Sequence, residues 1–378
     1  MPAVASATMA DGASSELLRA RFAAQRLSDA TRLGDDPAEI ARAVMSVQAQ
    51  ELNSGLLSLR ARSVGLTRDA ALAAMSRSGS LAWTWLMRGT LHVCAADDLR
   101  WLLALFGPIN ARRDATRRGQ VGLDDDTCAR GLRVIRAALA HGPMTRHELR
   151  EVLLSRHVNV LRDPQALIHL IALAASQGLI AVLPPVGRDN QVALLDDWIA
   201  PAKALPAEAA EAELARRYFA AFGPASIADF RVWAGIPAPL ANRATSLVSG
   251  ELELVEGPLP GLLRARAARV SGDSARESTV RLLPRWDTYV LGYRSRDVML
   301  HPTHSPRVCI GGVIKPTVCV DGSIDGAWEL RRERSGWRLE VLPFAKVSRA
   351  VRLGVAADAD NIASFLGATV QVTEVDPD

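Results

Sequence analysis

The sequence predicts an α+β protein made of three tandem winged-helix motifs followed by a C-terminal β-barrel-like domain. The first observation is an internal repeat, in which GPMTRHEL at residues 142–149 recurs as GPASIADF at residues 223–230. Each copy follows a segment with helical periodicity and supplies Thr-x-x-Glu or Ser-x-x-Asp, whose hydroxyl caps a second helix. A helix, a Gly-Pro turn and a capped helix open a helix-turn-helix. The second observation is a change to short strand-like runs after residue 257.

The N-terminal third, residues 15–123, fits the first winged helix. Asp36 offers an N-cap before Pro37, and Glu39 places an acid in the first turn, which together predict a helix start. Gly89-Thr90 predicts the turn of a wing hairpin within the Trp- and Val-rich residues 82–93. The expected helices are residues 15–27, 37 to about 47, a helix starting near 53, and 68–76.

The two repeat copies place the second motif at residues 124–205 and the third at residues 206–256. In each, a further helix follows the helix-turn-helix and leads into a strand. The predicted elements are helices at 132–139 and 165–177 with a strand at 179–183, then helices at 214–222 and 239–248 with a strand at 252–255.

The last predicted domain, residues 257–378, is rich in strands and basic. Gly, Pro and Asp-Gly turns separate its short apolar runs, which is typical of a small sheet or barrel. Residues 257–353 carry 17 Lys and Arg against 9 Asp and Glu, a local net charge of +8. Strands are expected at 279–283, 288–292, 308–314, 317–320, 327–331 and 337–341, with a closing helix at 358–366.

The composition excludes several classes of protein. With 49% hydrophobic and 23% charged residues, this chain of 378 residues is typical of a folded globular protein. No run of about 18 uncharged apolar residues is long enough to span a membrane. Residues 1–14 have neither the basic start nor the apolar core of a secretory signal. We therefore expect a disordered tail at 1–14 and a cytoplasmic, nucleoid-associated protein.

The cysteines and histidines predict neither a disulfide framework nor a metal centre. The four cysteines form no C-x-x-C pair. The nearest thing to a metal-binding cluster is His301 and His304 followed by Cys309 and Cys319, and this spacing matches no common zinc pattern. We expect no metal and no cofactor.

Two glutamines stand between the second and third predicted helices, in the segment SVQAQELN at residues 46–53. On a continuous helix Gln48 and Gln50 would point about 200° apart, so both amides reach one site only at a break. Asn53 as the cap of the next helix indicates such a break. Spacing alone favours the alternative, in which the two residues are surface glutamines in a polar turn.

Four stretches together resemble the AlkZ-like family of bacterial DNA glycosylases, from about Leu17 to Phe365. They are VQAQ at residues 47–50, RGTLH at 88–92, LPRWDTY at 283–289 with GYR at 292–294, and PTVCVDG at 316–322. The resemblance implies tandem winged helices followed by a β-domain. It also implies that Gln48 and Gln50 are catalytic, because a Gln-x-Gln or Gln-x-Asp motif is the family's signature. Trp286 stands where relatives often have Phe, and we expect this to affect packing only.

By this resemblance, the chain is expected to be a monofunctional DNA glycosylase acting on bulky N7-alkylated purines. The Gln-x-Gln form implies a role in DNA repair and self-resistance to DNA-alkylating natural products, with interstrand crosslinks as candidate substrates. Guanine alkylated at N7 already carries a positive charge, so its departure requires no proton donor. We expect Gln50 to position the water and Gln48 to help stabilise the oxocarbenium-like transition state. No catalytic lysine is expected, which argues against a Schiff-base lyase.

Double-stranded DNA containing alkylated purines is the expected partner, bound by a monomer. The basic β-domain is expected to supply phosphate contacts, with Arg285, Arg294 and Arg296 as candidates around the Trp-Asp-x-Tyr motif. The alternative is that these arginines are solvated surface residues. By resemblance, His301 belongs to a proline-rich hairpin that probes the minor groove near the lesion. The alternative is an ordinary loop.

Three further residues are candidates for lining the site: Asn53, His92 and Trp286. For His92, the alternative of a structural histidine at a hairpin end is favoured. We expect Trp83, Trp85 and Trp101 to be core residues, because aromatic side chains at such spacing usually pack.

Two other functions are compatible with the same sequence. Winged helices serve regulators more often than enzymes, so the chain is alternatively a non-enzymatic DNA-binding regulator or architectural protein. A third alternative is a family member that has kept the fold and lost its activity, against which the intact Gln48 and Gln50 argue.

Overall fold

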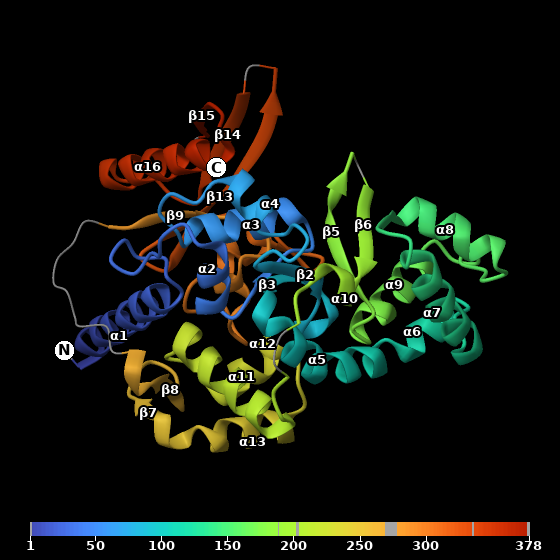
Figure 1. Ribbon diagram of the computed structural model, residues 1–378. Helices are drawn as coiled ribbons and strands as arrows, with labels where there is room; N and C mark the ends of the chain where they lie inside the picture. Colours follow the sequence, from blue (N-terminus) through green and yellow to red (C-terminus); the bar gives the residue numbers. More distant parts are fainter. Residues whose placement is uncertain (1, 188, 202–203, 269–277, 335, 376–378) are drawn as a thin grey trace. The chain divides into compact units, whose positions relative to one another are not determined.

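The computed structural model describes residues 2–187, 189–201, 204–268, 278–334 and 336–375, with the backbone alone for residues 2–11. The chain forms two compact units. One contains residues 1–70 together with 211–378, and the other contains residues 71–210 (Figure 1). Helices and sheets are mixed in both, as predicted for an α+β protein. No helix in the described ranges is long and apolar enough to cross a membrane.

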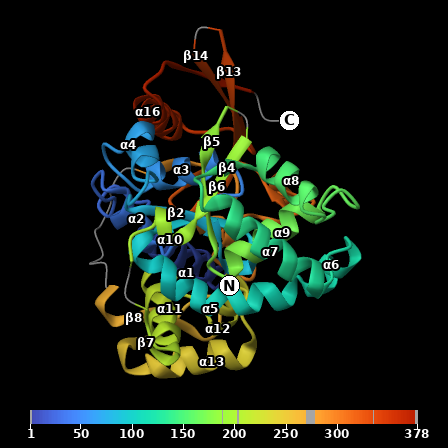
Figure 2. The same cartoon turned by 45° about the vertical axis from the view of Figure 1, so that its right-hand side comes forward.

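The unit of residues 71–210 contains an antiparallel sheet with the strand order β3-β2-β5-β6-β4. Figure 2 shows helices α7, α8 and α9 grouped beside β4 and β6. Gly107 lets two helices, α5 and α9, approach closely, because a Cβ there would collide with the Ser176 carbonyl. The bounds are β2 Leu81–Trp85, β3 Leu91–Ala95, α5 Leu99–Arg113, α6 Ala115–Gln120, α7 Asp125–Leu139, β4 Met144–Thr145, α8 Arg146–Ser155, α9 Ala166–Ser176, β5 Ile180–Val186, β6 Asp189–Leu194 and α10 Leu195–Trp198.

The other unit joins the N-terminal segment to three helices and a short hairpin from the middle of the chain. Its core includes a cluster of aromatic rings, in which Tyr218 stacks on Phe222 at 4.9 Å and also contacts Trp233. The bounds are α1 Pro2–Ala24, α2 Pro37–Ala43, β1 Val47–Gln48, α3 Leu52–Ala61, α12 Ile227–Ala234, α13 Ala238–Leu247, β7 Leu252–Val255 and β8 Leu262–Ala265. Two helices cross the unit boundaries, α4 Arg68–Ala73 and α11 Ala207–Phe222.

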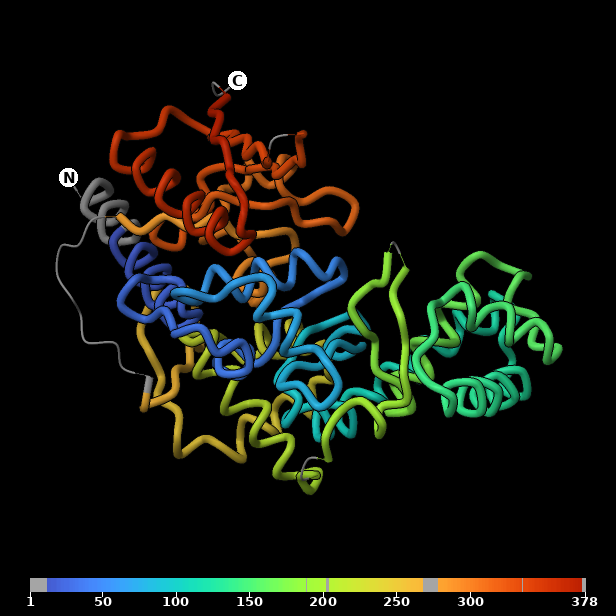
Figure 3. The backbone as a smooth tube through the Cα atoms, turned by 45° about the horizontal axis from the view of Figure 1, so that its top comes forward, coloured from blue at the N-terminus to red at the C-terminus, as the bar shows by residue number. Residues whose placement is uncertain are grey.

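The C-terminal part of this unit is an open sheet, which corrects the expectation of a barrel-like domain. The strand order is β15-β14-β13-β12-β9, and the edge strands β15 and β9 are not neighbours. Figure 3 draws the backbone of this part in orange to red. Helix α16, Arg349–Leu366, contacts β9 and β15 and contributes the buried Val355, Ile362 and Phe365 to the core. The strands are β9 Val280–Leu283, β12 Thr317–Val320, β13 Ser323–Glu333, β14 Gly336–Pro343 and β15 Val370–Glu374.

Three predicted elements are wrong. The predicted strand at 288–292 is a short helix, α14 Thr288–Leu291, which the Asp287 side chain caps by accepting from the Tyr289 amide. The predicted strand at 308–314 is the end of α15, Ser305–Val308, followed by a hairpin of β10 Cys309–Ile310 and β11 Val313–Ile314. The helix expected to run to about 47 ends at Ala43, where the chain turns through Met45 at φ 74°.

The internal repeat is confirmed in its local detail. Thr145 and Glu148 form a capping box at the start of α8, and Ser226 and Asp229 form the same box at the start of α12. Helix α1 begins before the expected position 15, and no side chain of residues 2–11 is described, so the tail at 1–14 stays a prediction. The predicted boundaries at 123, 205 and 256 and the number of winged helices likewise remain predictions.

Candidate functional site

The Gln-x-Gln segment lies between helices α2 and α3, at the end of the two-residue strand β1. Gln48 ends β1, a bend follows at Gln50, and α3 begins at Leu52. Val47 and Ala49 are fully buried, whereas Gln50 is exposed and Gln48 is 8% exposed. The two glutamines therefore differ in exposure, and the chain bends at the second of them. The break predicted at this point is therefore present.

Helix α3 holds the motif at very short range. A Cβ built on Gly55 would lie 2.5 Å from the Cβ of Ala49 and 3.6 Å from the carbonyl oxygen of Gln48. Only a glycine fits here without displacing Ala49, the residue between the two glutamines. Asn53, expected as the cap of this helix, is its second residue and is exposed, whereas Glu51 occupies the N-cap position.

A buried ion pair fixes the far end of α3 to the Trp-Asp-x-Tyr segment. Arg62 forms two parallel hydrogen bonds to the Asp287 carboxylate, each 2.8 Å long, and both side chains are fully buried. Ser58, one turn earlier on α3, donates to the same carboxylate at 2.6 Å. Arg62 also donates to the Gln25 side-chain oxygen at 3.0 Å. Burial alone would raise the pKa of Asp287, but the Arg62 cation and these donors hold that pKa below its usual value.

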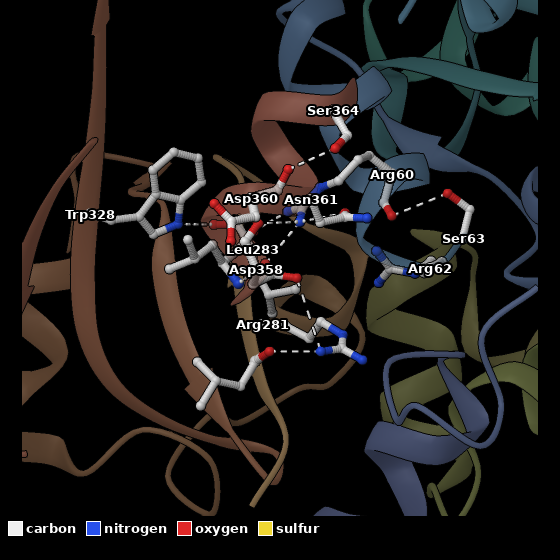
Figure 4. Close-up of polar contacts among 12 residues, drawn as sticks. Arg60, Arg62, Ser63, Arg281, Leu283, Trp328, Asp358, Asp360, Asn361 and Ser364 are labelled. Carbon is white, nitrogen blue, oxygen red and sulfur yellow. Dashed lines mark hydrogen bonds and ion pairs between the residues drawn. The ribbon is translucent and has the colours of Figure 1, made fainter. Parts of the chain in front are cut away.

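A second buried pair fixes the same helix to α16. Arg60 contacts the Asp358 carboxylate at 2.8 Å (Figure 4). It also donates to the Leu282 carbonyl of β9 at 2.7 Å. Asp358 in turn accepts from the Leu282 backbone amide at 2.8 Å. Both charges are nearly fully buried, at 1% and 2% exposure. Because removing one partner of such a pair costs about 3–5 kcal/mol, α3 has little freedom to move.

A cleft of about 880 Å³ is lined in part by the start of helix α3. Glu51, Asn53 and Ser54 line it directly after Gln50. The remaining walls combine apolar side chains with basic ones, and all of them belong to the unit of residues 1–70 and 211–378. The basic side chains lining the cleft are Arg68, Arg285, Arg307, Lys315 and Arg332.

Of the predicted DNA-binding residues, Arg285 alone lines this cleft. Arg285 is paired with Glu51 at 2.9 Å and lies 5.5 Å from the centroid of Trp286. Trp286 is half-buried, has φ 55°, and donates from its indole to the Gly312 carbonyl at 3.3 Å.

The other three are not brought to the cleft. Arg294 is exposed, and its backbone amide donates to Asp229. Arg296 is half-buried and donates to the Val290 carbonyl at 2.9 Å. His301 is exposed, and its ring is 2.7 Å from the Thr303 hydroxyl at the start of a short 3₁₀ turn.

His92 belongs to the unit of residues 71–210, where it lies in β3 and is 2% exposed. Its Nδ1–H donates to the Thr90 carbonyl at 2.8 Å, which satisfies one ring nitrogen. Burial, with the Arg88 cation as the second cause, lowers the pKa of His92 to about 3. A buried, neutral and hydrogen-bonded ring is typical of a structural histidine, which is the alternative favoured for His92 from the sequence. Trp83, Trp85 and Trp101 are buried, as predicted for core residues.

Arg60, Arg62 and Asp358 are not among the residues predicted from the sequence. The signal was available in α3, where LNSGLLSLRARS places two arginines in a run that is otherwise small or apolar. A buried arginine requires a carboxylate partner, but the sequence alone does not name that partner. In the described ranges, no group of three or more His, Cys, Asp or Glu residues is arranged to hold a metal ion.

Comparisons with known proteins agree on one family. Residues 41–365 match the model of the family described as DNA glycosylase AlkZ-like. A curated relative, the interstrand DNA cross-link repair glycosylase of Streptomyces sahachiroi, is 26% identical over 340 residues, 85% of this chain and 88% of the relative. The solved structure of Streptomyces sahachiroi DNA glycosylase AlkZ is 23% identical, with a TM-score of 0.77 over 96% of this chain and 99% of that chain. The two chains share a fold.

Proposed function

Because the chain belongs to the AlkZ-like DNA glycosylase family, we propose that this DNA glycosylase excises bulky N7-alkylated purines through Gln48 and Gln50. The observation that carries the proposal is the Gln-x-Gln segment at the break between α2 and α3. Gln48 ends β1 and is 8% exposed, and Gln50 is exposed at the bend that follows. Helix α3 packs against this segment at Gly55, and two buried ion pairs hold the other end of the helix in place.

The proposed chemistry relies on the charge of the substrate. An N7-alkylated purine is cationic, so its glycosidic bond breaks without protonation of the base. The amide oxygen of Gln50 positions the water beneath the anomeric carbon. The amide oxygen of Gln48 presents partial negative charge to the oxocarbenium-like transition state. Neutral amides are weaker bases than a carboxylate, so the reaction depends on a labile leaving base.

We extend the proposal to interstrand crosslinks and to self-resistance against natural products that alkylate DNA. The curated relative is named for interstrand cross-link repair, which supports crosslinks as substrates of this chain. A crosslink formed through the N7 positions of two purines presents the same cationic leaving base as a single adduct. Excision of one of the two bases would unhook it.

Double-stranded DNA is the proposed form of the substrate, bound by a monomer. Arg285, Arg294, Arg296 and His301 are proposed to contact it, and three winged helices are proposed as its scaffold. Asn53 and Trp286 are proposed to line the site. Arg285 is paired with Glu51, so its use for a phosphate requires exchange of one anion for another. The alternative of a non-enzymatic regulator is not favoured, because the family is one of glycosylases.

The direct test is base release from a duplex that bears a single N7-alkylguanine. We expect abasic product from the wild type, and a loss of about 100-fold or more in Gln48→Ala or Gln50→Ala. Gln177→Ala, which changes an exposed glutamine at the end of α9, is the matched control and is expected to keep the wild-type rate.

Binding of the same duplex separates the possible outcomes. Variants that bind like the wild type but release no base place the defect in the chemical step. A wild type that binds small and bulky N7 adducts without releasing either would contradict the proposed function and favour the non-enzymatic DNA-binding protein.

A further inference from the structure

We propose that a pocket in the unit of residues 71–210 binds a nucleotide, with its phosphate on arginines of the pocket and the exocyclic amine of its base on Asn110. The pocket is lined by residues of the β2–β3 turn, of the end of α5, of α6 and of α9, and it shares no lining residue with the cleft of about 880 Å³. The inference goes beyond the proposed function, because it requires neither an alkylated base nor Gln48 and Gln50.

The pocket has the size and the apolar surface of a site for one nucleobase. Its volume is about 180 Å³. A bound water needs roughly 10–15 Å³ of such space, so the pocket takes a larger group than a single ion. Among its lining residues, Trp85 and Leu173 are 7% and 6% exposed, and Ile168 and Ala172 are half-buried. An indole and aliphatic side chains suit the face of a planar base.

One buried hydrogen-bond acceptor at the pocket lacks a partner. Asn110 is 5% exposed, and its Nδ2 donates to the Leu86 carbonyl at 2.7 Å, which fixes the orientation of the amide. The Oδ1 atom of the same amide accepts no hydrogen bond from the residues that the structure describes. A buried acceptor costs free energy until a donor reaches it. The exocyclic amine of adenine, cytosine or guanine is such a donor.

The charged groups of the pocket favour an anion. Three guanidinium groups line it, those of Arg88, Arg113 and Arg118, against the single carboxylate of Asp114. Asp114 is already paired, with His169 at 2.8 Å and with Arg118 at 3.6 Å. Arg88 is half-buried and Arg113 is exposed, so both reach the solvent. The planar fork of arginine matches the oxygens of a phosphate, which we place at these two side chains.

Arg88 is held in a backbone conformation that an arginine rarely adopts. It lies at φ 57° in the turn between β2 and β3, and Gly89 follows at φ 71°. Hairpin turns with two such residues favour Asn, Asp or Gly. The turn also lies close to the buried acceptor, because a Cβ on Gly89 would be 3.6 Å from the Asn110 Oδ1. Strained residues cluster at ligand-binding sites, and a phosphate bound by Arg88 accounts for an arginine at this position.

Calorimetric titration of the intact protein, without damaged DNA, tests the two groups of the ligand separately. The ligands are deoxyadenosine monophosphate, the same nucleotide with hydrogen in place of the 6-amino group, and deoxyadenosine without phosphate. We expect saturable binding of deoxyadenosine monophosphate, and binding about tenfold weaker when either group is missing. Equal affinities for the three compounds would overturn the inference.

Three variants test the protein side. Arg88→Asn removes a cation and introduces a residue that the turn favours, so we expect about tenfold weaker binding with an unchanged Tm. Arg113→Gln removes a second cation, and Ala172→Leu fills the pocket; each should weaken binding about fivefold or more. The matched controls are Arg112→Gln, at an exposed arginine of α5, and Ala212→Leu, at a half-buried alanine of α11. Neither control residue lines the pocket, and both controls should bind like the wild type.

A single-stranded oligodeoxyadenylate distinguishes a free nucleotide from a nucleotide within a strand. If the ligand is free, the oligonucleotide does not displace deoxyadenosine monophosphate. If it belongs to a strand, the oligonucleotide binds more tightly and the same three variants weaken it; both results support the pocket. No saturable binding of either ligand up to about 1 mM, or equal affinities of wild type and the three variants, would overturn the inference. Base release is not measured, so failure of the proposed function leaves these results unchanged.

Discussion

At the scale of single residues, the site is organised by charges that the reaction does not use. Arg62 and Asp287 are fully buried and paired in bidentate geometry, and Asp287 also caps α14. One carboxylate therefore connects the helix after the motif to the segment that carries Arg285 and Trp286. The sequence singled out Asp287 as part of a recognisable stretch, but its role depends on Arg62, 225 positions away.

His92 gives the molecule a defined pH dependence. Burial, assisted by the Arg88 cation, lowers its pKa to about 3, whereas an unfolded chain titrates near 6.5. The neutral ring thus contributes stability that is fully present above pH 6.5 and is lost as the pH falls toward 3. Below pH 6.5 the expected loss is about 1.4 kcal/mol of unfolding free energy per pH unit.

Urea unfolding at pH 7.5 and 5.5 measures this effect. His92→Asn keeps a donor for the Thr90 carbonyl and does not titrate, so its stability should fall less over this interval, by about 1.4 kcal/mol. His301→Asn, at an exposed histidine, is the control and should follow the wild type. Equal losses in wild type and His92→Asn would show that the ring is not held neutral by the fold.

At the scale of elements, helix α3 packs against the Gln-x-Gln motif, and Gly55 makes the contact. Gly55→Ala would place a Cβ 2.5 Å from Ala49, so the motif or the helix must shift. We expect a loss of about 1–3 kcal/mol in stability, as for other overpacked cores, and at least a tenfold slower release of base. We expect the slower rate because Ala49 lies between the two glutamines, so that displacing Ala49 also displaces their amides.

Gly119→Ala is the matched control, since Gly119 also lies in a helix and has no atom within 4 Å of the added Cβ. It should keep the wild-type rate. Thermal unfolding of both variants distinguishes a displaced motif from a chain that no longer folds. A folded Gly55→Ala protein with the wild-type rate would contradict the role given to α3.

Elements with complete local signals were predictable, and elements defined by distant partners were not. The capping boxes of α8 and α12 and the strand at 252–255 follow from neighbouring residues. The segment at 288–292 is rich in β-branched and aromatic residues, which favours a strand, but the Asp287 cap and burial of Tyr289 and Val290 make it a helix. Tertiary packing overrides propensity at such short segments.

At the scale of the whole molecule, composition and repeat pattern predicted an α+β chain and a basic C-terminal region. They did not predict that the C-terminal sheet stays open, because barrel closure depends on which edge strands pair. The composition also does not show that residues 1–70 form one compact unit with residues 211–378. The cleft is formed by residues from both of these segments, so no local pattern reveals it.

We propose that two neutral amides suffice for catalysis because the substrate supplies the charge. The most direct measurement is single-turnover base release by the wild type from two duplexes of one sequence, one with cationic N7-methylguanine and one with neutral 8-oxoguanine at the same position. We predict release of the cationic base at least about 100-fold faster than release of the neutral one. Comparable rates for the two bases would contradict the claim and require a proton donor in the site.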